Sequence, residues 1–130
     1  GLALAADYQR INYGEVDVLG TSGFGWTSVN VYKLGIQYAF EHFALRAGFS
    51  HGDNPVPMAA IDLNGAVPVM IQNHATAGFT ANLGESSELN VALIYGLDKT
   101  AEGASIAFPG VTIESNQSQY AAEISFGVRF

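Results

Sequence analysis

The chain has 130 residues, with 12 acidic and 5 basic side chains and a formal net charge of −7 at pH 7. Charged residues make up only 13 % of it, about half of the roughly 25 % usual in soluble domains. An acidic chain repels phosphate and so disfavours nucleic-acid binding, the absence of Cys excludes disulfides and thiolate metal sites, and an apolar content of 48 % argues against disorder.

Apolar residues alternate with polar or small ones along most of the chain, which is the pattern of β-strands with one apolar face. In chain order, the alternating segments of about ten residues cover residues 2–9, 32–40, 43–50, 74–83, 89–98 and 120–130. The longest continuous apolar stretches, such as residues 66–71, fall far short of the ~18 residues of a membrane-spanning helix.

The connections between these segments alternate in length along the chain. Tight turns are expected at residues 41–42 and 84–87, and long loops at roughly 12–28, 52–73 and 99–118. In an up-and-down meander, this alternation places every long loop at one end of a single sheet and every tight turn at the other. The sequence shows no internal linker or domain boundary.

Strand length and polarity favour a membrane barrel over a soluble sandwich. Segments of this length approach the ~9–11 residues with which a tilted strand crosses a bilayer, whereas sandwich strands average ~5–6 residues. The less apolar face carries small and amide side chains with isolated charges, rather than the dense Lys and Glu of a water-facing sheet. Aromatic residues concentrate near strand ends, as in the girdles of membrane barrels: Tyr8, Tyr32, Tyr38, Phe40, Phe43, Tyr95, Tyr120 and Phe130.

The predicted fold class is therefore all-β: an antiparallel up-and-down transmembrane β-barrel. Six strands are fewer than the eight of the smallest common barrels, and unpaired strand edges facing lipid are prohibitive. Either further strands lie upstream or several copies assemble, and a chain that begins inside a strand favours the former. With periplasmic tight turns, the long loops face the exterior of a bacterial outer membrane. A soluble binding sandwich is the remaining alternative.

The loop at residues 53–71 is unusually apolar for an extracellular loop, and three prolines stiffen it. Exposed apolar surface on this scale usually marks a binding site. The candidate substrate-binding residues are Val56, Pro57, Met58, Ile61, Leu63, Val69 and Met70. The loop either collects a hydrophobic substrate or folds inward and packs on its own barrel, and the two interpretations are compatible.

The polar candidates Lys33, Arg46 and His74 lie on the face that would line the barrel lumen. Lys33 and Arg46 lie on neighbouring strands and could attract a carboxylate head group. The alternative, which we favour, is charge pairing within the lumen with Asp7 or Glu123.

His51 and His74 flank the apolar loop, with Asp53 nearby. A metal site is conceivable there, but two His without a third ligand at fixed spacing is a weak signal. We expect hydrogen bonding at the rim by these residues, His74 included, and no metal.

No catalytic motif emerges, since nothing like G-x-S-x-G is present. The glycine-rich GFGW at residues 23–26 follows no strand-to-helix turn, so phosphate binding is not supported. The chain is expected to be a non-enzyme without a cofactor.

Several segments together resemble the FadL/TodX family of outer-membrane transporters for long-chain fatty acids and other hydrophobic compounds in Gram-negative bacteria. They are YQRINY at 8–13, GFGW at 23–26, VYKLGIQY at 31–38, LRAGFSHGDNPVP at 45–57, HATAGFT at 74–80 and the final Phe130. The block at 45–57 is the most specific of these.

The resemblance implies a fourteen-stranded barrel with an N-terminal plug, of which this chain supplies the six C-terminal strands. Residues 1–130 are then a single partial domain, the C-terminal part of an outer-membrane β-barrel. The implied function is transport of long-chain fatty acids or aromatic hydrocarbons, captured by apolar extracellular loops and passed through the barrel without energy input. The implied partners are a hydrophobic small molecule, outer-membrane lipid and the N-terminal remainder of the same barrel. A general porin or structural barrel is the alternative.

Overall fold

The computed structural model describes residues 1–57, 61–64 and 71–129, without the side chains of Leu63 and Asn64. These residues form one antiparallel sheet of six strands whose spatial order equals the chain order. The strands are β1 (Leu2–Ile11), β2 (Val29–Ala39), β3 (Phe43–Gly52), β4 (Asn73–Asn82), β5 (Ser87–Ala104) and β6 (Thr112–Val128). A 3-10 turn, η1 (Tyr13–Glu15), and a short helix, α1 (Ile61–Asn64), lie in the connections. No helix in the described part of the chain is long and apolar enough to span a membrane.

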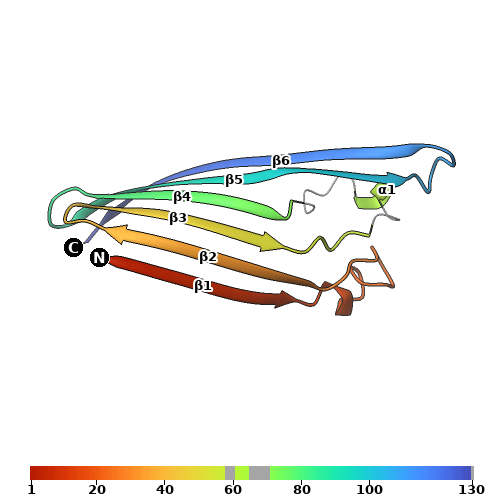
Figure 1. The fold of residues 1–130 in the computed structure, drawn as a ribbon, viewed down its shortest axis with the longest axis horizontal. Helices are drawn as coiled ribbons and strands as arrows, with labels where there is room; N and C mark the ends of the chain where they lie inside the picture. The colour runs from red at the N-terminus through yellow and green to blue at the C-terminus, as the bar shows by residue number, and fades with distance from the viewer. Residues whose placement is uncertain (58–60, 65–70, 130) are drawn as a thin grey trace.

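The strands run up and down with tight turns at one end and longer connections at the other. Residues 40–42 and 83–86 form the turns, beside which both chain termini lie (Figure 1). The opposite end holds residues 12–28, the described parts of the β3–β4 connection (53–57, 61–64 and 71–72) and the tip of the β5–β6 hairpin (Figure 1). This arrangement confirms the predicted all-β, up-and-down fold.

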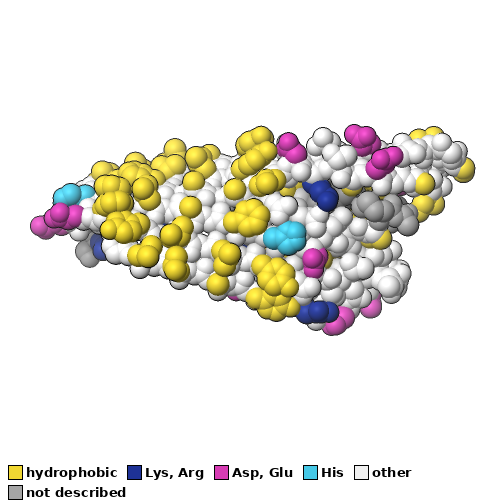
Figure 2. Space-filling model, viewed as in Figure 1, with side chains coloured by type: hydrophobic (Ala, Val, Ile, Leu, Met, Phe, Trp, Pro, Cys, Tyr) yellow, Lys and Arg dark blue, Asp and Glu magenta, His cyan; other side chains and the backbone are white. Residues whose placement is uncertain are grey.

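The strand registers place polar and apolar side chains on opposite faces of the sheet. Asp7 lies opposite Lys33, and Arg46 lies opposite both Gln37 and Gly78, on what we call the polar face. The other face, the apolar face, carries large exposed side chains, and Figure 2 shows them in rows across the strands. They include Leu4, Leu34, Leu45, Phe79, Leu93, Ile124 and Phe126.

One sequence-based expectation is wrong: residues 99–118 do not form a long loop. β5 and β6 pair from Lys99 with Gln117 up to Ala104 with Thr112, so only residues 105–111 connect them. This upper part of the hairpin carries few large apolar side chains, and the alternation that revealed the other strands fades there. Backbone hydrogen bonds between β5 and β6 hold this part of the hairpin together, although its side chains do not alternate between apolar and polar.

A β-bulge interrupts β5 at the base of this extension. Between the pairs Gly96–Gln119 and Lys99–Gln117, β5 advances by three residues while β6 advances by two. The extra residue shifts the alternation by one position. Ala101 therefore shares the polar face with Gly96, and Ile113 of β6 lies on that face too.

β1 and β6 are the free edges of the sheet, so the six strands form an open fragment of a barrel. A single layer buries little, and the described buried apolar residues gather mainly among the connections at the loop end of the sheet.

Candidate functional site

Apolar side chains from two connections, 12–28 and 53–72, and from the β5–β6 hairpin pack together at the loop end of the sheet. Trp26, Val56, Ile61 and Ala101 are buried, with Ile61 fully enclosed, and the half-buried Tyr13, Leu19 and Ile113 pack against them. We call this set the loop cluster. Tyr13 meets Trp26 edge to face, with 5.4 Å between the ring centroids. The cluster lies on the polar face of the β5–β6 hairpin, because Ala101 and Ile113 point to that side.

The first half of the 53–72 connection is fixed to β2 and to the 12–28 connection by hydrogen bonds. The Asn30 backbone N–H and side-chain amide both donate to the Asp53 carboxylate at 3.0 Å, and the Tyr8 hydroxyl donates to the Asn30 amide oxygen at 2.9 Å. The Thr27 N–H donates to the Pro55 carbonyl at 2.9 Å. These bonds hold Val56 beside Trp26.

The second anchor joins α1 to the tip of the β5–β6 hairpin. The Asp62 carboxylate accepts hydrogen bonds from the backbone N–H groups of Ile106 and Ala107. Ile61, the neighbour of Asp62, is thereby held over the hairpin.

Both anchoring carboxyl groups titrate below their ordinary range. Donation by the Asn30 backbone and side chain lowers the pKa of Asp53 from 3.8, and the nearby His51 lowers it further. Donation by the Ile106 N–H lowers the pKa of Asp62 from 3.8. Both carboxylates are charged at neutral pH, where these hydrogen bonds are strongest.

The end of the connection also returns across the polar face. The Ile71 side chain covers Gly96, so a Cβ added at Gly96 would lie 3.0 Å from the Ile71 Cγ2 and 3.2 Å from the Gln119 Cβ. A glycine at position 96 leaves room for the loop to lie flat against β5. Among the described residues of the β3–β4 connection, Val56, Ile61 and Ile71 therefore lie over the polar face.

The predicted substrate-binding residues fall into three groups. Val56 and Ile61 are buried in the loop cluster, as expected for a loop that packs on its own barrel. Pro57 is half-buried and lies near Gly25, whose added Cβ would be 3.4 Å from the proline ring. Met58, Val69 and Met70, and the side chain of Leu63, lie outside the described residues. Contact of any of these residues with a substrate remains a prediction.

The polar face carries a hydrogen-bond chain that crosses four strands. The Arg46 guanidinium donates to Gln37 at 2.7 Å and to the Thr80 hydroxyl at 2.6 Å. Thr80 donates to Asn90 at 2.5 Å, and the Asn90 amide donates to Glu88 at 3.3 Å. Among the described residues, Arg46 forms no ion pair with a carboxylate, and Glu123 is not one of its partners.

Lys33 behaves as the charge-pairing interpretation predicts. Its ammonium lies 3.1 Å from the Asp7 carboxylate on the adjacent strand and 3.4 Å from the Gln9 amide oxygen. The ion pair is half-exposed, so it contributes little to stability.

The two histidines that flank the apolar connection lie on opposite faces of the sheet. His51 is on the apolar face opposite Asn73, whose amide oxygen is 2.7 Å from its Nδ1. His74 is on the polar face opposite Ser50. Within the described ranges, no three His, Asp or Glu side chains come together in a metal-binding arrangement. The hydrogen bond of His51 agrees with the expected role at the rim.

Sequence reasoning missed the members of the loop cluster that lie outside the apolar connection, Trp26 and Ala101 among them, and it missed the anchor Asp62. Trp26, the chain's single Trp within a glycine-rich segment, was a signal that could have marked a buried anchor. Ala101 and Asp62 carried no such signal, because a bulge positions the first and a contact over 44 residues of sequence fixes the second.

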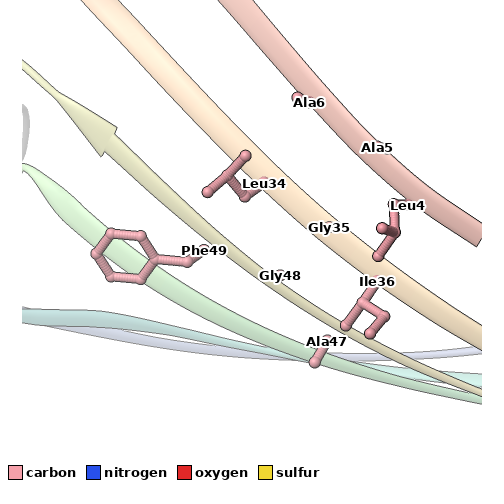
Figure 3. A pocket seen from close by; sticks show the side chains of 9 residues that line it. All are labelled: Leu4, Ala5, Ala6, Leu34, Gly35, Ile36, Ala47, Gly48 and Phe49. Atoms are coloured by element: carbon pink, nitrogen blue, oxygen red, sulfur yellow. The ribbon is translucent and has the colours of Figure 1, made fainter.

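A groove of about 690 Å³ lies on the apolar face between β1, β2 and β3. Leu4, Leu34, Ile36 and Phe49 line it, together with small residues that leave the space open (Figure 3). It is continuous with the exposed apolar band and distant from the loop cluster. The groove is therefore part of the apolar face and not of the loop cluster.

Comparison with known proteins relates this fold to a solved transporter. No protein-family model matches the sequence, and no curated protein gives a significant match. The crystal structure of the toluene transporter TodX from P. putida superposes with a TM-score of 0.74 and 21 % sequence identity. The match covers 99 % of this chain and 31 % of that one, so the chain spans about a third of the length of TodX. The resemblance seen in the sequence is confirmed at the level of fold, as a fragment of the TodX β-barrel.

Proposed function

We propose that the chain is part of a bacterial outer-membrane transporter for small hydrophobic molecules, long-chain fatty acids or aromatic hydrocarbons. It acts as a passive, non-enzymatic conduit together with the remainder of its barrel. The observation that carries the proposal is the loop cluster: an apolar site built around Trp26, Val56 and Ile61 beside the polar face of the sheet. The fold shared with a toluene transporter supports it.

The apolar face supports the membrane part of the proposal. Its exposed side chains would be unfavourable in water, at about 25 cal/mol per Å² of apolar surface. Aromatic pairs lie toward both ends of this face, Phe40 stacked on Phe43 and Tyr95 stacked on Tyr120. Rings with this placement suit the two lipid–water boundaries of an outer-membrane barrel.

The loop cluster supports capture of an apolar ligand at the mouth of the conduit. Ile61 is fully enclosed, so it stabilises the packed loop, and a ligand reaches it only when α1 moves. Half-buried members such as Tyr13 and Leu19 remain accessible at the margin. A ligand that binds there exchanges water for apolar contacts, and this exchange needs no energy source.

The polar face favours a second candidate, a general porin. The hydrogen-bonded Arg46 and the Lys33–Asp7 pair would suit a water-filled passage. The two candidates differ in what crosses the membrane: small sugars for a porin, apolar molecules for a hydrophobic-compound transporter.

Uptake and leakage measurements on the full protein separate these candidates. Cells that express it should take up radiolabelled toluene or oleate faster than cells without it, and liposomes that contain it should retain small sugars. A Trp26→Ala variant, made to loosen the loop cluster, should slow uptake severalfold at equal membrane abundance. Rapid sugar leakage without enhanced uptake would reject the proposal in favour of a porin.

A further inference from the structure

Arg10 is the outermost β1 side chain on the apolar face. It follows Leu4 and Tyr8 on this face and lies opposite Asn30 of β2. Its side chain is exposed, and the guanidinium Nε donates to the Asn12 amide oxygen at 3.2 Å, which leaves the two terminal amino groups able to contact a ligand. No carboxylate in the described part of the chain forms an ion pair with it. A cation thus lies at the loop end of the apolar face, where neither the loop cluster nor the polar face uses it.

Two tyrosines separate Arg10 from the apolar side chains. Tyr8 and Tyr32 lie opposite each other with 5.2 Å between the ring centroids, and the Tyr8 hydroxyl donates to the Asn30 amide oxygen at 2.9 Å. In an outer-membrane barrel, such rings lie at the lipid–water boundary. Arg10 is two residues beyond Tyr8, about 7 Å along the strand. In the proposed barrel, its guanidinium is therefore at the depth of the lipid headgroups.

The groove between β1, β2 and β3 begins on the other side of these tyrosines. Leu34 and Phe49 stand beside it, whereas the short side chains of Ala6 and Ala47 leave about 690 Å³ open (Figure 3). From Arg10 to Ala6 the distance along β1 is four residues, roughly 13 Å. One leaflet contributes ~15 Å of hydrocarbon. An acyl chain whose headgroup lies at Arg10 can therefore enter the groove within the same leaflet.

Charge and shape together select the ligand. A guanidinium binds phosphate oxygens through paired N–H donors, and the groove offers only apolar contacts. Free phosphate would use Arg10 and leave the groove empty, whereas a neutral lipid would fill the groove and leave the guanidinium in water. A phosphorylated lipid uses both parts.

We propose that Arg10 and the groove form a binding site for a phosphorylated membrane lipid of the leaflet at the loop end. The phosphate contacts the guanidinium, and one acyl chain lies between β1 and β3. This inference rests on the proposed outer-membrane location and concerns a site outside the conduit. It differs from general contact with the bilayer, because it assigns one lipid to one cation and one groove.

Headgroup preference is tested by native mass spectrometry of the full protein released from detergent micelles. The probes are dimyristoyl phosphatidic acid and dimyristoylglycerol, which share their acyl chains and differ in the phosphate. The unaltered protein should bind phosphatidic acid about fivefold more tightly, as expected for one exposed charge-assisted contact. Arg10→Gln should abolish this preference, since glutamine keeps a polar side chain and removes the charge.

Arg129→Gln is the matched control for charge. Arg129 is an exposed cation at the tight-turn end of the sheet, where it already pairs with Glu88. This variant should keep the preference for phosphatidic acid. Equal binding of the two lipids by the unaltered protein, or the same loss of preference in both variants, would overturn the inference.

The part played by the groove is tested by filling it. The double variant Ala6→Phe, Ala47→Phe should weaken binding of both lipids severalfold, because the rings occupy the space of the acyl chain. The control Ala75→Phe, Ala122→Phe adds the same rings at exposed positions of the apolar face outside this groove, and it should bind both lipids as the unaltered protein does. Unchanged binding by the groove variant would contradict the inference.

The inference and the proposed function fail in different ways. A protein that supports toluene uptake in cells but shows no preference for phosphatidic acid would overturn the lipid site alone. A full protein that stays in solution without detergent and binds neither lipid would reject the proposed outer-membrane location, and the lipid site with it.

Discussion

Thr80 is the residue on which the hydrogen-bond chain of the polar face depends. It is buried, it accepts from Arg46, and it donates to Asn90, so its hydroxyl joins β3 to β5 across β4. A buried hydroxyl that both accepts and donates is worth more than an isolated exposed bond, because its removal takes a partner from the Arg46 Nη1 and from the Asn90 amide oxygen at once.

Replacing Thr80 with Val should therefore destabilise the full protein by about 1–3 kcal/mol. The valine keeps the side-chain shape but removes the hydroxyl. Thr76→Val is the matched control, because Thr76 lies on the same strand and the same face but is exposed. Urea-induced unfolding in lipid vesicles measures both variants. Equal midpoints for the two would show that the chain of bonds adds nothing to stability.

Sequence alone could predict some residue pairs on this face and not others. The pairing of Lys33 with Asp7 follows from two adjacent strands once their register is known. Arg46 was equally expected to pair with an acid, yet its long side chain reaches Gln37 and Thr80 instead. Which of several nearby acceptors a guanidinium selects depends on side-chain geometry that periodicity does not contain.

At the level of elements, the 12–28 connection depends on close backbone contacts at glycine. A Cβ at Gly23 would lie 1.8 Å from the Val18 carbonyl oxygen, so no side chain fits without moving the backbone. The same connection hydrogen-bonds Trp26 N–H to the Leu19 carbonyl at 2.7 Å, and this bond sets the position of the indole. The fold of this connection and the site of Trp26 are thus linked.

Gly23→Ala should displace Trp26 from the loop cluster. The expected result is a shift of the 5-fluorotryptophan ¹⁹F signal of Trp26 toward its solvent-exposed value. The signal is assigned by its absence in Trp26→Phe. Gly52→Ala is the control, since its added Cβ would meet only the Val31 Cγ2 at an ordinary 3.5 Å. An unshifted signal in Gly23→Ala would contradict the proposed link.

The two carboxylate anchors make the packing of the 53–72 connection sensitive to acid. The folded-state pKa of Asp53 and of Asp62 is lowered from 3.8. Their stabilising contribution is therefore complete above pH 3.8 and lost as the pH falls through the folded values. The Trp26 ¹⁹F signal should stay constant from pH 7 to 5 and move below 3.8. In the double variant Asp53→Asn, Asp62→Asn, this acid transition of the Trp26 signal should be absent or much smaller. A transition of full size in the double variant would show that other groups cause it.

The strands themselves followed from period-two alternation wherever one face was apolar. β1 to β4 begin and end within a few residues of the predicted bounds, because their apolar face carries an apolar side chain at nearly every second residue. The upper parts of β5 and β6 were missed, since backbone pairing there needs no apolar face. The loop cluster could not be assembled from the sequence because its members, from Tyr13 to Ile113, are separated by up to 100 residues.

On the scale of the whole molecule, the sheet separates two environments residue by residue. Ile124 and Ser125 are neighbours in β6 at the same height, yet the first is 73 % exposed on the apolar face and the second lies on the polar face opposite Asn90. An identical substitution at the two positions therefore tests the orientation of the sheet in the bilayer.

Ile124→Arg should destabilise the full protein in lipid vesicles by about 2–4 kcal/mol if it lies near the bilayer midplane. Ser125→Arg should change stability by less than about 1 kcal/mol, since the polar face meets water and carries the acidic Glu88 and Glu123 nearby. Refolding titrations in the same vesicles compare the two. If both substitutions had the same effect, the apolar face would not be the lipid-facing one.

The two edge strands differ in length: β1 has 10 residues and β6 has 17. The strands that adjoin them in a closed barrel must therefore pair over different lengths. In the proposed outer-membrane barrel, the part of β6 between Tyr120 and the tight-turn end lies in hydrocarbon. Every amide and carbonyl on its outer edge there must form a hydrogen bond with a neighbouring backbone. Between Tyr120 and the loop end of β6, water can form hydrogen bonds with the same groups. The adjoining strand can therefore end before it reaches the tip of the hairpin. Pairing of β6 with an adjoining strand is thus obligatory on the tight-turn side of Tyr120 and optional on the loop side. Where the adjoining strand ends first, a solvent-filled gap remains beside the β5–β6 hairpin.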